Sequence, residues 1–291
     1  MQIPCEHEVL KTGDLGSPQI RFIPDCMKHA AAFALVVALA PAAAASAETG
    51  WSEIMPGARL RALSAGTEAE GRALVGIEIE LGAGINTYWR LPGETGLPTT
   101  VAASGGDGPV DLEMRWPLPE WDLSEGYVDL VYRDTIILPA LVDAPAAAPL
   151  TLEIVMGVCS DICVPFRATL SLPGDARTDP GNSLRLRQAL NLTPIPFEGV
   201  DPPLGEMEFD RTTGALSMLF DPQRIDPMQV FPSLDGTASM FGAPEVDEAR
   251  NRLQFALLAP GGDTSWQAAA LRLTFATDDG PYEIVRKLES R

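Results

Sequence analysis

The hydrophobic pattern of the chain is that of β-strands over most of its length. Apolar and polar residues alternate in Leu74–Leu81, Thr151–Met156 and Arg167–Leu172, and Thr135–Val142 is rich in β-branched residues. A period of two places every second side chain on the same face of a sheet. Glycine and proline separate these segments at short intervals. Many short strands with regular turn signals predict a β-sandwich or a barrel.

The same alternation returns in the last third of the chain, in Ala215–Phe220, Arg252–Leu258 and Ala270–Phe275. Between the two strand-rich regions, Asn182–Leu190 has apolar residues at helical spacing, and a proline-rich stretch follows it. We therefore expect an all-β protein with two sandwich domains in tandem, joined by a connector that contains one short helix. The expected boundaries are 48–173 for the first domain, 174–203 for the connector and 204–291 for the second domain.

The N-terminal region has the pattern of a secretory signal peptide. A short basic start at residues 27–29 precedes the apolar run 30–40 and the small residues Ala45-Ser46-Ala47. This order predicts a cleaved signal over residues 27–47, with an uncleaved anchor as the alternative. Because a signal peptide stands at the N-terminus, we interpret residues 1–26 as a wrongly assigned extension. The mature protein is then secreted and begins at Glu48.

Charge and composition exclude several classes of function. The 291 residues include 40 acidic and 21 basic ones, for a net charge of -19. Nucleic acids and anionic lipids bind clustered basic residues, so we expect neither as a partner. The two histidines, His7 and His29, precede the mature chain. We therefore expect neither histidine-based catalysis nor a histidine-based zinc or copper site. The interpretation that we favour for the mature chain has no metal and no other cofactor.

Two cysteines, Cys159 and Cys163, remain in the mature chain, because Cys5 and Cys26 precede it. The pair lies in a turn between two predicted strands. A disulfide over so short a loop stabilises a fold by only about 2 kcal/mol, which gives a purely structural bond weak support. The spacing alone leaves a structural disulfide, a redox-active pair and a copper(I) site that includes Met156 as alternatives.

The residues around the pair carry a resemblance to a known family. Gly157–Pro165 resembles the active segment of the N-terminal periplasmic domain of DsbD-type protein-disulfide reductases, most closely the ScsB-like variant with a shortened loop between the cysteines. Gly126-Tyr127 with Val131–Pro139 is similar to the segment that precedes these cysteines in the family. Thr87–Pro98 is similar to its early aromatic and basic strand. The three stretches occur in the family's order, within residues 50–173.

The resemblance implies an immunoglobulin-like β-sandwich in the periplasm that acts as a component of a thiol-disulfide oxidoreductase system. Its partners would be a separately encoded membrane-embedded thiol reductase, which donates electrons, and thioredoxin-like periplasmic proteins, which accept them. Cys163 matches the cysteine that attacks the acceptor, and Cys159 matches the resolving partner. The alternative class is a periplasmic binding module with a structural disulfide, or a copper-handling protein.

Some members of the family cover the disulfide with an aromatic residue just before the position of Tyr127. This chain has Ser124-Glu125-Gly126 there, so that aromatic residue is missing. We expect Tyr88, Trp89 or Tyr127 to shield the sulfurs or to contact a partner instead, with Trp121 as a further candidate for the shield. For Trp89 the alternative is an ordinary place in the core, which is usual for aromatic residues of β-sandwiches.

Overall fold

The computed structural model describes residues 47–67, 71–143, 148–174, 179–210, 212–237, 239–258 and 269–287. All of them fall in one compact unit, Ala44–Arg291. The expected extension and signal peptide lie outside the described residues, apart from Ala47. Among the described residues, no helix is long and apolar enough to cross a membrane.

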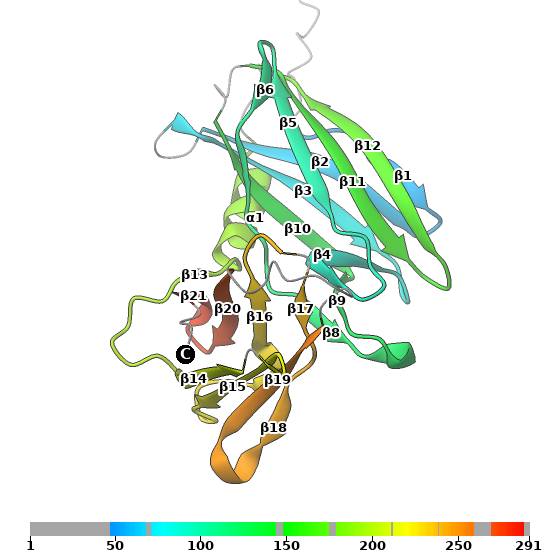
Figure 1. Ribbon diagram of the computed structural model, residues 1–291. Coiled ribbons are helices and arrows are strands. Elements are labelled where there is room, and N and C mark those ends of the chain that lie inside the picture. The colour runs from blue at the N-terminus through cyan, green and yellow to red at the C-terminus, as the bar shows by residue number, and fades with distance from the viewer. Residues whose placement is uncertain are drawn as a thin grey trace, which may run out of the picture. The chain divides into compact units, whose positions relative to one another are not determined.

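Two β-sheets pack face to face in the first part of this unit (Figure 1). In the first sheet the strand order is β1 (Ser52–Met55), β2 (Ala58–Thr67), β3 (Ala73–Leu81), β10 (Thr135–Val142) and β7 (Leu112–Met114). In the second sheet it is β6 (Gly108–Val110), β5 (Thr100–Gly105), β11 (Leu150–Cys159), β4 (Asn86–Gly93), β9 (Asp129–Arg133) and β8 (Glu120–Asp122), and β12 (Cys163–Leu172) pairs with β11. The short 3-10 helix η2 (Ser124–Gly126) connects β8 to β9.

The core between these sheets follows from the alternation in the sequence. Inward-facing residues of β3, such as Ile77 and Ile79, meet inward-facing residues of β11, such as Ile154 and Met156, in one buried cluster. Because each strand buries one set of alternate side chains, the register of each pair is fixed by the hydrophobic pattern. The prediction of an all-β sandwich is confirmed for this part of the chain.

A single α-helix, α1 (Pro180–Asn191), covers the outer face of the first sheet in the part of the chain that the structure describes. The Asp179 side chain caps it by accepting a hydrogen bond from the Asn182 N–H at 2.8 Å. Leu186 is fully buried and fills the space above Gly76, where an added Cβ would lie 2.3 Å from a Leu186 methyl carbon. The helix expected at Asn182–Leu190 is therefore present and is packed against the sandwich.

A buried carboxylate reinforces this packing. Glu78 lies on the outer face of β3 and is only 2% exposed. Its Oε2 accepts a hydrogen bond from Arg61 Nε at 2.7 Å, and its Oε1 pairs with Arg185 of α1. A buried charge is tolerated only when it is paired, so these two arginines join the helix, β2 and β3.

A second set of strands follows the helix. Its order is β13 (Ile195–Pro196), β21 (Gly280–Lys287), β20 (Ala270–Thr277), β16 (Val230–Leu234), β17 (Met240–Phe241), β19 (Arg252–Leu258), β15 (Ala215–Phe220) and β14 (Leu204–Asp210), with β18 (Glu245–Asp247) beside β19 and the 3-10 helices η3 (Pro227–Gln229) and η4 (Glu248–Arg250) between strands. Residues from both ends of this path, such as Leu216 and Phe275, share one buried cluster. The sheet therefore folds around its own core.

One residue of the second set of strands belongs to the core of the first. Phe231 of β16 is fully buried and packs against Trp121, with ring centroids 5.4 Å apart, and against Trp89, at 6.1 Å. Beside it, Arg90 Nη2 donates a hydrogen bond to Ser233 Oγ at 2.9 Å. These contacts join β4 and β8 of the first region to β16 of the second.

Candidate functional site

The hairpin of β11 and β12 carries the two cysteines. Cys159 ends β11, Cys163 begins β12, and the two are direct cross-strand partners in the register of the hairpin. Their Cα atoms are 4.0 Å apart, and their sulfurs form a disulfide. Opposite positions of an antiparallel pair bring side chains on one face together, so the three-residue loop is long enough for the bond to close.

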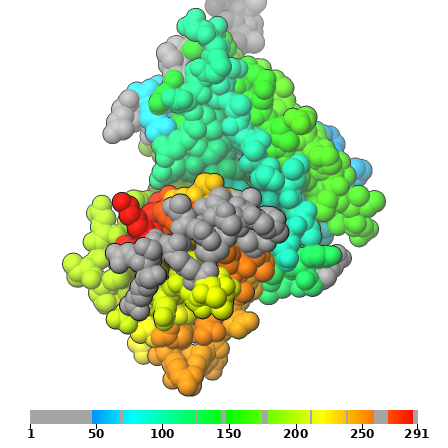
Figure 2. Space-filling model, viewed as in Figure 1, coloured from blue at the N-terminus to red at the C-terminus, as the bar shows by residue number. Residues whose placement is uncertain are grey.

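The two sulfur-bearing residues have very different exposure. Cys159 is 4% exposed, whereas Cys163 is exposed and is followed by exposed residues of β12. Ile162, in the loop between them, is 72% exposed. Figure 2 shows the green hairpin of β11 and β12 uncovered along one side of the visible face. A reacting thiol can therefore approach this bond from the side of Cys163.

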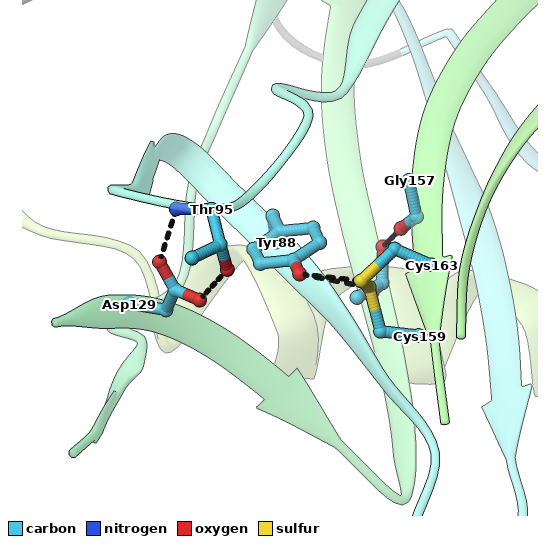
Figure 3. Close-up of a disulfide and its surroundings, with 7 residues drawn as sticks. Tyr88, Thr95, Asp129, Gly157, Cys159 and Cys163 are labelled. Carbon is cyan, nitrogen blue, oxygen red and sulfur yellow. Dashed lines mark hydrogen bonds between the residues drawn. A yellow bond between two sulfur atoms is a disulfide. The ribbon is translucent and has the colours of Figure 1, made fainter. Parts of the chain in front are cut away.

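The Tyr88 hydroxyl lies against the disulfide (Figure 3). Its oxygen is 2.8 Å from Cys159 Sγ and 3.4 Å from Cys163 Sγ. Since neither sulfur of a disulfide carries a proton, the phenol must be the donor. Tyr88 is 2% exposed, and this burial raises the pKa of its hydroxyl. The group therefore stays protonated and able to donate.

Strand pairing explains why Tyr88 reaches the sulfurs. β4 lies between β9 and the end of β11, and Thr87 pairs with Val158 while Tyr88 pairs with Val131. The buried Thr87 hydroxyl donates a hydrogen bond to the Gly157 carbonyl at 2.7 Å, which fixes β4 to β11 just before Cys159. Tyr88 and Cys159 then share a small buried cluster with Val131.

The loop that follows β4 holds the Tyr88 ring in place. Thr95 donates its backbone N–H to Asp129 Oδ1 at 3.0 Å and its hydroxyl to Asp129 Oδ2 (Figure 3). Gly96 lies so close to the ring that an added Cβ would be 2.4 Å from Tyr88 Cδ1. A Cβ added to Gly157 of β11 would likewise lie 3.2 Å from the Tyr88 ring. Two glycine backbones thus leave the ring little room to move.

The other expected site residues lie elsewhere. Trp89 points into the sandwich core, opposite to Tyr88, and the Arg90 guanidinium lies 4.3 Å from the centre of its ring. Tyr127 follows η2 and is 52% exposed; among the described residues, it makes no hydrogen bond or ring contact with the disulfide. Met156 is buried in the core on the face of β11 opposite to Cys159, so it does not add a third sulfur beside the pair.

Sequence reasoning missed three residues of this site, Thr95, Gly96 and Asp129. Gly96 adjoins the Tyr88 ring and Thr95 is hydrogen-bonded to Asp129, and the place of all three depends on the pairing of β4 with β9. A glycine between the end of one strand and Pro98 is a weak signal, because such glycines mostly mark turns. Within the described ranges, no group of three or more histidine, cysteine or acidic side chains could hold a metal ion.

Comparison with known proteins connects this geometry to a family. The family model described as "Thiol:disulfide interchange protein DsbD, N-terminal" matches residues 52–174, which include both cysteines, Tyr88 and Asp129. No curated protein matches the chain.

Among solved structures, the N-terminal periplasmic domain of ScsB from Proteus mirabilis aligns with 84% of this chain and 100% of its own, at 20% identity and a TM-score of 0.67. That likeness shows a shared fold that extends beyond the first sandwich. The periplasmic chaperone SfaE aligns with 77% of this chain and 95% of its own, at 10% identity and a TM-score of only 0.19, which is too low to indicate a shared fold. Residues 52–174 are therefore a DsbD-type N-terminal domain, an immunoglobulin-like thiol-disulfide interchange domain with a cysteine pair.

Proposed function

We propose that this protein carries out thiol-disulfide exchange in the periplasm through Cys159 and Cys163. Electrons come from a membrane-embedded thiol reductase and pass to thioredoxin-like periplasmic proteins. The observation that supports this function best is the asymmetry of the pair, with one exposed and one buried cysteine residue in the same disulfide-bonded hairpin. In such a pair the exposed cysteine reacts with a partner, and the buried cysteine then resolves the mixed disulfide.

The forward step needs only the two thiols. The thiolate of reduced Cys163 attacks one sulfur of an acceptor disulfide, a new bond forms between the proteins, and the second acceptor sulfur leaves as a thiolate. The Cys159 thiolate then attacks Cys163 Sγ, which restores the internal disulfide and releases the first acceptor sulfur as a thiolate. Two electrons have moved to the acceptor, whose thiolates take up protons from water, so the chemistry needs no histidine or cofactor.

Regeneration runs the same steps in reverse. A thiolate of the membrane reductase attacks Cys163 Sγ, and Cys159 leaves as a thiolate; the second thiol of the reductase then resolves the mixed disulfide. In this proposal the buried Tyr88 shields Cys159 from other oxidants, and the exposed Tyr127 is a partner contact. Trp89 acts through packing, because its ring belongs to the core.

The periplasmic location is supported by the relatives and by the sequence. The ScsB domain that shares the fold is a periplasmic domain, and residues 27–47 have the pattern of a signal peptide. A structural disulfide in a surface hairpin needs no exposed sulfur, whereas an exchange protein does. The exposure of Cys163 therefore favours exchange over a purely structural bond.

Trapping a mixed disulfide tests this function. In Cys159→Ser the attacking thiol remains but cannot be resolved, so it should accumulate a covalent adduct with an oxidised thioredoxin-fold protein at Cys163. In Cys163→Ser the remaining thiol is buried, and no adduct should form at a comparable rate. Both variants should also carry Cys5→Ser and Cys26→Ser, so that only one thiol is present. Equal adduct formation in the two variants, or none in Cys159→Ser, would contradict the proposal.

A further inference from the structure

We infer that Tyr88 is a catalytic residue of the exchange reaction: its hydroxyl stabilises the Cys159 thiolate that forms when a partner attacks Cys163. This inference deepens the proposed function and rests on it. It assigns Tyr88 a role in the bond-breaking step itself, in addition to shielding.

Charge develops on the buried sulfur. When a donor thiolate attacks Cys163 Sγ, its lone pair forms the new sulfur–sulfur bond, and the electron pair of the old bond leaves on Cys159 Sγ. Cys159 is 4% exposed, so little water can solvate the thiolate that results. Burial without a hydrogen bond disfavours such an anion and makes the sulfur a poor leaving group.

The Tyr88 hydroxyl is a donor aimed at that sulfur. It lies 2.8 Å from Cys159 Sγ, closer than to Cys163 Sγ at 3.4 Å. A hydrogen bond to an ionised acceptor is roughly twice as strong as one between neutral groups, so this bond strengthens as charge appears. The phenol therefore favours Cys159, and not Cys163, as the sulfur that leaves.

Among the described residues, the charges that act on the Tyr88 hydroxyl are negative and do not stabilise a neighbouring anion. Burial raises the pKa of the Tyr88 hydroxyl, and the negative charges of Asp129 and Asp122 add to that rise. A carboxylate opposes the formation of a neighbouring thiolate and does not assist it. Burial and these charges together keep the proton on the Tyr88 oxygen, so the group remains a donor and does not become a second anion.

The donor needs no rearrangement when the bond breaks. Tyr88 is held by its strand pairing with Val131, and its ring is enclosed by Gly96 and Gly157. Preorganised donors that point to the site of developing charge are the general means by which proteins stabilise such charge. The sequence Thr95-Gly96, fixed to Asp129, therefore serves the chemistry indirectly by holding the phenol in position.

The acidity of Cys159 tests this inference directly. In a chain with Cys5→Ser, Cys26→Ser and Cys163→Ser, Cys159 is the single cysteine, and its 13Cβ chemical shift reports ionisation during a pH titration. Adding Tyr88→Phe keeps the ring and removes the hydroxyl. We expect the acid dissociation constant of Cys159 to fall about tenfold or more, which is a rise of about one pKa unit or more. The matched control Tyr282→Phe removes a hydroxyl in β21 and should leave the constant unchanged.

A second measurement uses the otherwise unchanged chain. Dithiothreitol should reduce the Cys159–Cys163 disulfide several-fold more slowly in Tyr88→Phe than in Tyr282→Phe, with unfolding in urea recorded for both. An unchanged Cys159 titration and an unchanged reduction rate would overturn the inference, even if Tyr88→Phe lowered stability, because stability alone reports packing. The Cys159 titration does not depend on any partner, so this failure is distinct from a failure to trap the mixed disulfide.

Discussion

The contact between Gly96 and the Tyr88 ring gives the sharpest prediction about the site, because it can be tested with a single added methyl group. In Gly96→Ala the new Cβ would lie 2.4 Å and 2.5 Å from two Tyr88 ring carbons and 2.6 Å from Pro92 Cβ. Favourable carbon contacts lie at about 3.5–4.0 Å, so all three are about 1 Å too short. None of the atoms is the end of a flexible chain, and either the loop or the ring must shift.

Overpacking of this kind usually costs about 1–3 kcal/mol, and we expect that loss of unfolding free energy in Gly96→Ala. Gly106 is the matched control, because an added Cβ there meets nothing within 4 Å and its backbone φ is not positive. Gly106→Ala should be neutral or should stabilise the protein by up to about 1 kcal/mol, through a less flexible unfolded chain. Of the two substitutions, only Gly96→Ala should therefore lower the free energy of unfolding.

Urea unfolding followed by tryptophan fluorescence gives both free energies, provided that the slope of free energy against denaturant stays constant. The rate of disulfide reduction by dithiothreitol should fall in Gly96→Ala and not in Gly106→Ala, because only the first displaces the phenol from Cys159. If the two variants had the same stability and the same reduction rate, the loop would not hold Tyr88, and our account of the site geometry would be wrong.

Three further predictions concern stability. Phe231→Ala should cost about 3–5 kcal/mol in urea unfolding, because a fully buried ring is lost from the core of the first sandwich; a loss below about 1 kcal/mol would contradict that placement. Thr87→Val should cost about 1–3 kcal/mol by leaving the buried Gly157 carbonyl without its hydroxyl donor, and an unchanged urea midpoint would argue against this bond. The hydrogen bond from Arg72 lowers the pKa of Glu113 in the folded protein. The stabilisation that this bond provides should therefore be fully present above about pH 4.3, the ordinary pKa of a glutamate, and should be lost as the pH falls through the lower pKa of the folded state. Urea midpoints measured from about pH 6 down to about pH 3 should therefore fall less steeply in Glu113→Gln than in the unsubstituted protein.

The strands were largely predictable because their signal is local. The segments Leu74–Leu81 and Thr135–Val142 agree with β3 and β10 to within one residue. The expected strands on either side of the cysteines are too short, since β11 continues to Cys159 and β12 begins at Cys163. Gly157 and Pro165 interrupt the alternation there, although both residues can occur in the strands of a hairpin. Pro165 is accommodated because it lies on β12, which is paired on one side only.

Long-range contacts were not predictable from the pattern. The alternation in β4 shows that Tyr88 and Trp89 face opposite sides, but it does not show which side carries the disulfide. That choice depends on the pairing of β4 with β11, which joins residues 71 positions apart. Phe231 is a similar case. A phenylalanine in a strand is expected to be a core residue, but the sequence does not show that Phe231 of β16 packs in the core of the first sandwich. Such contacts depend on tertiary packing, which a single sequence does not specify.

The reduction potential of the Cys159–Cys163 pair distinguishes a disulfide that transfers electrons from one that is only structural. The oxidised and reduced forms can be quantified in a series of thiol–disulfide buffers by alkylation and mass spectrometry of the peptide that contains both cysteines, which separates them from Cys5 and Cys26. An exchange protein should have a potential between about -180 and -270 mV. A potential below about -300 mV would identify a structural disulfide and contradict the proposal of electron transfer through this hairpin.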